Sequence, residues 1–153
     1  DGTDVRRITQ NPDRDSSPDW HPDGSVIVYR ARVGGNSDIS ITNVAGGITY
    51  NLTTDPGFDG DPTWSPDGEQ ILFTTDRTGD YEIFVMDRNG ENLRNLTNHP
   101  ANDEFPAWSP DGTLIAFHSD RSYGLHLFLM RADGSDQSAI SSVAPSGYPR
   151  FKP

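Results

Sequence analysis

The hydrophobic positions of the chain fall into short runs that recur every 44 residues. The two most apolar runs of one repeat, at residues 70–74 and 83–86, are consecutive rather than alternating. Consecutive apolar residues over so few positions predict short strands that are buried on both faces. The matching runs of the other repeats lie at residues 26–30, 114–118, 39–42 and 127–130.

Turn residues separate these runs at fixed positions. Each first strand ends in a Trp, followed two residues later by Pro-Asp-Gly; the three Trp are Trp20, Trp64 and Trp108. Pro presets φ, Asp can bond its own backbone and Gly accepts a positive φ, so this sequence predicts a hairpin turn. Gly-Gly, Asn-Gly or Asp-Gly follows the third strand and favours a tight turn. A more polar outer strand is then expected at residues 6–9, 50–53 and 94–97.

A period in the forties, built from four short strands, indicates a β-propeller with one antiparallel blade per repeat. The repeats run at about 2–45, 46–89 and 90–133, with a partial one at 134–153, in a single propeller segment spanning residues 1–153. About three and a half blades cannot close a ring, since closed propellers have 4 to 8. Two alternatives stay open: a partial ring from a longer propeller, or a ring completed by copies of the chain. A compact monomer with its end faces covered by loops is the least favoured arrangement.

The order of motifs resembles the TolB-like propeller repeat. It reads Leu-Thr, a loop, Trp-Ser-Pro-Asp-Gly, an apolar strand, Ser/Thr-Asp-Arg and Ile/Leu-Phe-x-Met. The Asp-Arg pairs are Asp76-Arg77 and Asp120-Arg121, whereas the first repeat departs with His21 and Arg32-Val33. The resemblance implies that each Asp-Arg pair makes a hairpin bond or an inter-blade salt bridge. The fixed phase of the three Trp predicts packing between blades. The resemblance also implies a periplasmic or extracellular location.

Composition narrows the classes of partner. The formal net charge is −11, from 23 acidic and 12 basic residues. A chain this acidic repels phosphate groups, which disfavours nucleic acid and anionic membranes and favours cations or basic protein surfaces. No apolar run approaches the length of a membrane span, and the chain has no cysteine for disulfides or thiolate metal sites. Copies of the chain itself remain a candidate partner, so a homo-oligomer is expected unless the chain is a fragment.

Three aspartates recur just before the first strand of each repeat: Asp15, Asp59 and Asp103. The resemblance places this segment near one mouth of the central channel, where converging carboxylates could hold calcium. A residue that recurs in every blade is better explained by bonds to turn amides within its own blade. No cofactor is therefore expected, and calcium stays an alternative.

Catalysis is not expected. The four histidines fall at different positions of the repeat without the spacing of a zinc site, and no nucleophile elbow is present. The sequence therefore predicts a non-catalytic scaffold that binds a protein partner through its channel-mouth loops. The residues expected to contact that partner are Asp15, Asp19, Phe58, Asp59, Asp61, Asp103, Glu104 and Phe105. The alternatives are a gating propeller of a larger hydrolase or lyase, and a fragment that only self-assembles.

Overall fold

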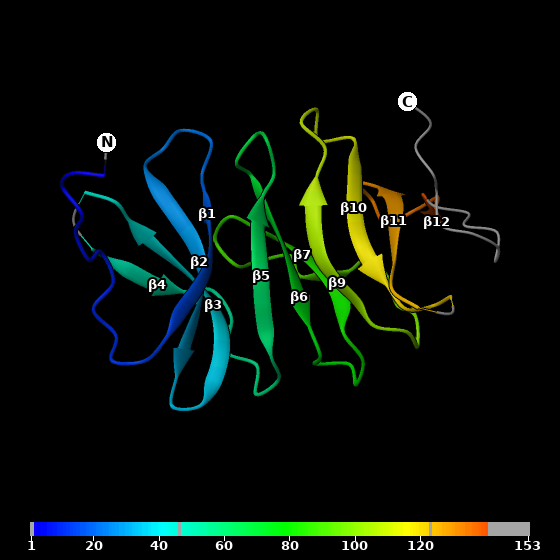
Figure 1. Cartoon of the computed structure of the whole chain (residues 1–153), viewed down its shortest axis with the longest axis horizontal. Coiled ribbons are helices and arrows are strands. Elements are labelled where there is room, and N and C mark those ends of the chain that lie inside the picture. The colour runs from blue at the N-terminus through cyan, green and yellow to red at the C-terminus, as the bar shows by residue number, and fades with distance from the viewer. Residues whose placement is uncertain (1, 46, 123, 141–153) are drawn as a thin grey trace, which may run out of the picture.

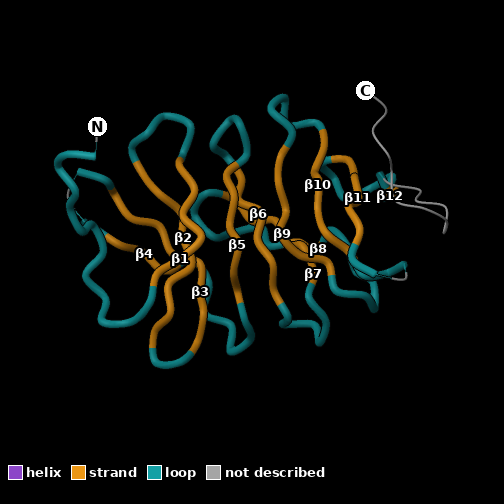
Figure 2. The backbone as a smooth tube through the Cα atoms, in the orientation of Figure 1, coloured by secondary structure: helices purple, strands orange, loops and turns teal. Residues whose placement is uncertain are grey.

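The protein is built from three four-stranded antiparallel sheets placed side by side (Figures 1 and 2). The computed structural model describes residues 2–45, 47–122 and 124–140, and this part of the chain holds twelve strands and no helix. The strands are β1 (Asp15–Trp20), β2 (Val26–Val33), β3 (Asn36–Asn43), β4 (Thr49–Asn51), β5 (Asp59–Trp64), β6 (Gln70–Thr75), β7 (Glu82–Asp87), β8 (Arg94–Asn95), β9 (Asp103–Trp108), β10 (Leu114–Ser119), β11 (His126–Arg131) and β12 (Ser138–Ala139).

Each sheet is one propeller blade, because its four strands pair in chain order. The first strands β1, β5 and β9 lie next to one another in space, and the later strands of each blade fan outwards behind them (Figure 1). The predicted all-β class with four-stranded propeller blades is confirmed, as an open, partial ring. We number the blades one to three from the N-terminus.

The predicted hairpin turns join the first and second strands of each blade. Gly68 N–H donates to the Ser65 carbonyl at 2.9 Å, and Gly112 N–H donates to the Ser109 carbonyl at the same distance. Both glycines have positive φ, +75° and +70°, which suits the turn because glycine has no Cβ to clash. The turns therefore lie together at one end of the three first strands, and the strand starts lie at the other.

The Trp at the end of a first strand packs on the preceding blade. Trp64 is only 5% exposed and lies in one apolar cluster with Val28 and Ile39 of blade one. Trp108 packs in the same way against the cluster that contains Leu72 and Ile83. Trp20 differs from the expectation, since it is 56% exposed. The described residues place no blade before β1, so its ring has no apolar face to cover it.

Blade three departs from the prediction of burial on both faces, whereas Ile27, Val28 and Tyr29 on β2 of blade one are all buried, as predicted. In blade three, β10 and β11 alternate between buried and exposed positions, with Leu114 and Leu127 both exposed, because no described blade follows. Residues 6–9 were predicted to form an outer strand, and this is wrong: they pair with no strand among the described residues. Ile8 instead packs beside the buried side chains of Ile27 and Tyr29, on the face of blade one that is turned away from blade two.

Candidate functional site

A kink recurs at the same place in every first strand. The pairing register shifts within β1, β5 and β9, and one non-glycine residue at each shift has a left-handed backbone. These residues are Ser17, Asp61 and Phe105, with φ of +51°, +50° and +55°, and each precedes a proline. Left-handed backbone is uncommon outside glycine, and such bulges turn a side chain away from the regular alternation of the strand.

Phe105 is the bulkiest of the three bulge residues, and its side chain remains 51% exposed. Its backbone N–H donates to Thr74 Oγ1 of blade two at 3.2 Å, and its ring meets the His118 ring edge-on, with centroids 5.6 Å apart. Ser17 and Asp61 hold the same backbone conformation with small polar side chains. The bulge therefore does not require an aromatic residue, and the fold does not account for this exposed ring.

Two carboxylates lie beside Phe105. Asp61 Oδ1 accepts a hydrogen bond of 3.1 Å from Ser17 Oγ, which links blades one and two. Partial burial raises the pKa of Glu104; the charges of Asp61 and Asp120 act in the same direction, and His118 opposes them. Negative charge is thus concentrated around the bulges of β5 and β9.

A second aromatic group lies between blades one and two. The Arg30 guanidinium stands 5.3 Å from the centre of the Phe58 ring, whose edge meets Tyr81 with 5.6 Å between centroids. Gly60 allows this placement, because a Cβ at that position would collide with the Phe58 ring. Burial raises the pKa of the Tyr81 hydroxyl, helped by the nearby charge of Asp76.

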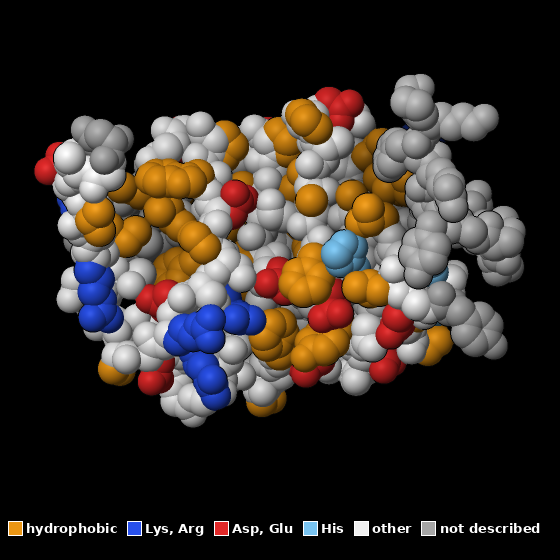
Figure 3. Space-filling model, in the orientation of Figure 1, with side chains coloured by type: hydrophobic (Ala, Val, Ile, Leu, Met, Phe, Trp, Pro, Cys, Tyr) orange, Lys and Arg blue, Asp and Glu red, His pale blue; other side chains and the backbone are white. Residues whose placement is uncertain are grey.

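These side chains form one surface near the starts of the first strands. We call it the mouth cluster: Arg30, Phe58, Asp61, Tyr81, Glu104, Phe105 and His118. Figure 3 shows hydrophobic, acidic and histidine side chains gathered over the lower part of this face, with a group of Lys/Arg side chains beside them. The sequence prediction missed Arg30, Tyr81 and His118. The sequence did offer one signal for two of them. Arg30, Thr74 and His118 occupy the same position of the repeat but differ in chemistry, whereas a position with a purely structural role would be expected to keep one residue type.

Asp59 and Asp103 do not reach this surface. Both carboxylates are fully buried, and they pair with Arg77 at 2.8 Å and with Arg121 at 2.5 Å. Each pair lies within one blade rather than between blades. The neighbouring Asp76 accepts from the Phe58 backbone N–H at 2.7 Å and so ties down the same loop. Asp120 does the same for blade three by accepting from the backbone N–H of Asn102 at 2.8 Å.

Asp15 and Asp19 also make structural bonds. Asp15 Oδ1 accepts from Asn11 Nδ2 at 2.6 Å. Asp19 Oδ2 accepts from the Trp64 backbone N–H at 2.7 Å and from Thr63 Oγ1 at 3.1 Å, and these bonds tether blade one to blade two. The structure thus separates the predicted residues into two groups. Phe58, Asp61, Glu104 and Phe105 lie at the surface, whereas Asp15, Asp19, Asp59 and Asp103 make bonds within a blade or between blades.

The family is shown by comparison with known proteins. The TolB beta propeller domain family matches residues 1–148. The chain belongs to the TolB β-propeller family. A search of curated protein sequences found no match.

Solved TolB propellers share this fold over most of the chain. The putative TolB from Agrobacterium tumefaciens is 27% identical, with a TM-score of 0.80 over 86% of this chain and 50% of that one. TolB from Acinetobacter baumannii is 24% identical, with a TM-score of 0.75 over 82% of this chain and 32% of that one. The chain therefore spans half of the first protein's length and about a third of the second's.

Two solved enzymes contain a region with the same fold. A puromycin-hydrolyzing peptidase from Mycobacterium tuberculosis is 16% identical, with a TM-score of 0.76 over 95% of this chain and 24% of that one. An oligogalacturonate lyase solved with manganese is 13% identical, with a TM-score of 0.68 over 89% of this chain and 44% of that one. At these identities the likeness shows the fold alone.

The described part of this TolB-family chain brings no three His, Asp or Glu side chains close enough to hold a metal ion. The candidates Asp15, Asp59 and Asp103 accordingly do not form a joint set of ligands there. In the same residues, no helix is long and apolar enough to cross a membrane.

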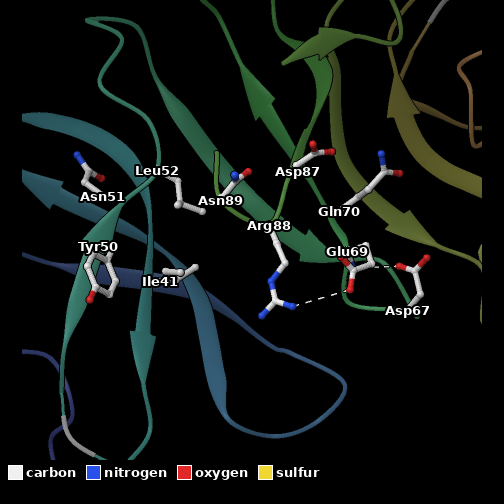
Figure 4. Close-up of a pocket in the computed structure, with 10 residues that line it drawn as sticks. All are labelled: Ile41, Tyr50, Asn51, Leu52, Asp67, Glu69, Gln70, Asp87, Arg88 and Asn89. Atoms are coloured by element: carbon white, nitrogen blue, oxygen red, sulfur yellow. Dashed lines mark hydrogen bonds and ion pairs between the residues drawn. The ribbon is translucent and has the colours of Figure 1, made fainter. Parts of the chain in front are cut away.

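A groove of about 850 Å³ lies outside the mouth cluster, between blades one and two (Figure 4). Ile41, Tyr50 and Leu52 line it from blade one, and an exposed Arg88–Glu69 pair at 3.8 Å lines it from blade two. None of the buried, unpaired polar atoms of the described residues belongs to its lining. It is the open space between two diverging blades, and no predicted site residue lies in it.

Proposed function

We propose that this TolB-family chain is a non-catalytic protein-binding propeller segment, and that the mouth cluster is its contact surface. The observation that carries the proposal is Phe105, an aromatic side chain left 51% exposed on a left-handed backbone. Non-glycine residues in such conformations concentrate at binding and active sites, where the surrounding structure supports their cost. A half-exposed aromatic ring beside charged groups is also typical of the anchors that dominate protein interfaces.

The charges around the ring indicate the chemistry of the partner. Asp61 and Glu104 lie close to Phe105, and the Phe58 ring contacts both Tyr81 and the Arg30 guanidinium. A partner segment with a Lys or Arg beside an apolar side chain would match the acidic part, and the net charge of −11 would steer it in. Because Asp59 and Asp103 are buried and paired, we leave them out of the proposed contact surface.

The test is selection of binders from a displayed random-peptide library with the native chain as bait. We expect enriched peptides to combine Lys or Arg with an apolar residue. Their affinity for the Phe105→Ser variant should be about 10-fold lower or more, because this substitution removes an aromatic anchor that would be buried on binding. Serine already occupies the matching left-handed position at Ser17, so this variant keeps the bulge.

A matched control is Leu93→Ser, which removes a 41%-exposed apolar side chain outside the mouth cluster. Its affinity for the selected peptides should equal that of the native chain. Peptides that bind Phe105→Ser as tightly as the native chain would contradict the proposal.

A second candidate function is gating of a catalytic domain. The observation that favours it is the likeness to the puromycin-hydrolyzing peptidase, where a segment of this shape makes up 24% of the chain. The sequence of the full-length protein decides between the two: a hydrolase domain with a nucleophile elbow favours gating, and propeller blades alone favour binding. We also propose a periplasmic or extracellular location, which rests on family resemblance alone.

A further inference from the structure

The junction between blades one and two contains a histidine ring that the next junction lacks. His21 lies in the hairpin turn of blade one and meets the Trp64 ring edge-on, with 4.8 Å between centroids. Its Nε2 lies 3.2 Å from the Gly68 carbonyl oxygen, and its Nδ1 lies 2.8 Å from the Asp23 carboxylate. The ring is therefore held by a tryptophan, a turn carbonyl and a carboxylate, and Trp64 is only 5% exposed.

The junction between blades two and three repeats these partners without the ring. The residues 44 positions later are Trp108, Gly112, Asp67 and, in place of His21, Ser65. The Ser65 hydroxyl donates to Asp67 Oδ1 at 2.6 Å, within its own turn. A Cβ built on Gly68 would collide with the His21 ring, whereas the nearest atom to a Cβ on Gly112 is Pro66 Cδ, at 3.7 Å. The space that the His21 ring fills in the first junction is therefore open in the second.

This space is a pocket of about 370 Å³ at the turn end of the first strands (Figure 1), and we call it the turn pocket. The residues of its lining that matter here are Ser65, Asp67, Trp108, Asp111, Gly112 and Ala132. Trp108 is only partly buried, since no ring covers it as His21 covers Trp64. Ala132 occupies the repeat position of Arg88 and leaves this side of the pocket without a long side chain. No described residue donates a hydrogen bond to the Gly112 carbonyl.

Two carboxylates give the turn pocket a negative charge. Hydrogen bonds from the Ser65 hydroxyl and the Glu69 N–H lower the pKa of Asp67. The pKa of Asp111 is lowered to about 2 by bonds from its own turn. Both side chains are therefore ionised at neutral pH and favour a ligand that donates N–H groups. An imidazole group donates one N–H when neutral and two when protonated, and it is flat enough to lie against a tryptophan.

We propose that the turn pocket binds an imidazole group in the place that His21 takes in the preceding junction. The bound ring would lie edge-on to Trp108, donate to the Gly112 carbonyl and face the Asp67 carboxylate. The ring belongs to a histidine of another polypeptide or to a small molecule that carries the same group. This site lies at the opposite end of the first strands from the mouth cluster, and it does not depend on the protein-binding function proposed above.

The experiment titrates the full chain with imidazole and follows the carbon-bound protons of the Trp108 ring and the Ala132 methyl group by NMR. At about pH 9, well above the ordinary histidine pKa of about 6.5, imidazole is neutral and has one N–H. The matched ligand 1-methylimidazole has none at that pH. We expect imidazole to bind with a Kd on the order of 1 mM, and 1-methylimidazole to bind at least about 5-fold more weakly.

Two variants exchange the junctions. Ser65→His supplies the missing ring from within the chain and should weaken imidazole binding more than 10-fold; His21 shows that this turn accepts a histidine. His21→Ser should open a second pocket, so that imidazole also shifts the Trp64 ring and raises the urea midpoint of this variant more than that of the native chain. Tyr50→His adds a ring at a 61%-exposed position outside both junctions and should bind imidazole as the native chain does.

Two further ligands distinguish the sources of the ring. N-acetylhistidine amide represents a histidine within a polypeptide, and histamine represents a free small molecule; both should compete with imidazole, and the tighter of the two identifies the source. The proposal would be overturned by an unshifted Trp108 ring at about 100 mM imidazole, a concentration far above the expected Kd. Equal binding of 1-methylimidazole, or undiminished binding to Ser65→His, would overturn it as well.

Discussion

At the scale of single residues, the buried Asp-Arg pairs account for the most regular polar feature of the repeat. Asp59 is fully buried, and Arg77 bridges both of its oxygens at 2.8 and 3.0 Å while lying over the Phe73 and Phe84 rings. A buried carboxylate without its cation carries a large desolvation cost. The pair therefore fixes the loop from which Phe58 projects. In blade three, Arg121 pairs with Asp103 through Oδ2 alone, and Asp103 Oδ1 has no hydrogen-bond partner among the described residues.

Arg77→Met should lower the free energy of unfolding by about 3–5 kcal/mol at neutral pH, because Asp59 is left buried and unpaired. Urea unfolding followed by circular dichroism measures this loss. Arg131→Met removes the exposed Arg131–Asp136 pair, should cost no more than about 1 kcal/mol, and serves as the control. Equal costs for the two variants would contradict this account.

The hairpin turn of blade three makes a prediction about pH. Hydrogen bonds from the Ser109 hydroxyl and the Thr113 backbone N–H lower the pKa of Asp111 from 3.8 to about 2. A lowered pKa stabilises the fold above the unfolded value of 3.8, and this contribution is lost as the pH falls towards 2. In a carboxyl NMR titration, Ser109→Ala should raise the pKa of Asp111. It should leave Asp67 unchanged, because Asp67 bonds to Ser65 instead. An unmoved Asp111 would show that the hydroxyl is not the cause.

At the scale of elements, the hairpin turn of blade one contacts the end of the first strand and the turn of blade two. His21 replaces the serine of the other repeats and lies edge-on to Trp64, with centroids 4.8 Å apart. Its ring is 7% exposed and reaches the Gly68 carbonyl, with His21 Nε2 at 3.2 Å. The departure of the first repeat at His21 is therefore a specific contact between blades one and two.

Gly68→Ala should destabilise the protein more than Gly112→Ala. Both place alanine at a left-handed position, which costs about 1–2 kcal/mol. At Gly68 the new Cβ would also collide with the His21 ring, which adds about 1–3 kcal/mol of overpacking, whereas at Gly112 the nearest contact is an ordinary 3.7 Å to Pro66. Chemical denaturation of the two variants gives the difference. The excess should disappear in the His21→Ala background, and its persistence there would rule out the ring as the cause.

The sequence allowed the strands and turns to be predicted because they repeat, as with Trp64, Trp108 and the Pro-Asp-Gly turns. It could not show which blade faces are covered by a neighbouring blade. It therefore placed Trp20 in a junction between blades and predicted a strand at residues 6–9. For the site, it identified Phe58, Asp61, Glu104 and Phe105 by their place before or within a first strand. It did not identify Arg30, Tyr81 and His118, because these join the cluster through contacts between residues that are far apart in the chain. Arg30 contacts Phe58 of the next blade, and Tyr81 and His118 contact Phe58 and Phe105 within their own blades. It also could not separate exposed acids from Asp59 and Asp103, whose burial depends on their arginines.

At the scale of the whole molecule, the three first strands present one continuous face on which the blades differ in charge. Blade one carries Arg30 and Arg32 on β2, while Asp61 and Glu104 lie on β5 and β9. The repeat therefore supplies a common backbone, and the variable positions on this face supply an uneven surface. A partner of the proposed kind would bind this surface in one orientation, because its positively charged groups would be attracted to the acidic side chains of blades two and three.

The measurement that tests this account most directly is a backbone-amide NMR titration of the native chain with a selected peptide. We predict shifts at Phe58 to Asp61, Tyr81, Glu104, Phe105 and His118, with the Pro-Asp-Gly turns at the other end of the first strands unchanged. Shifts confined to those turns or to the groove around Tyr50 and Arg88 would contradict the assignment of the mouth cluster as the binding surface.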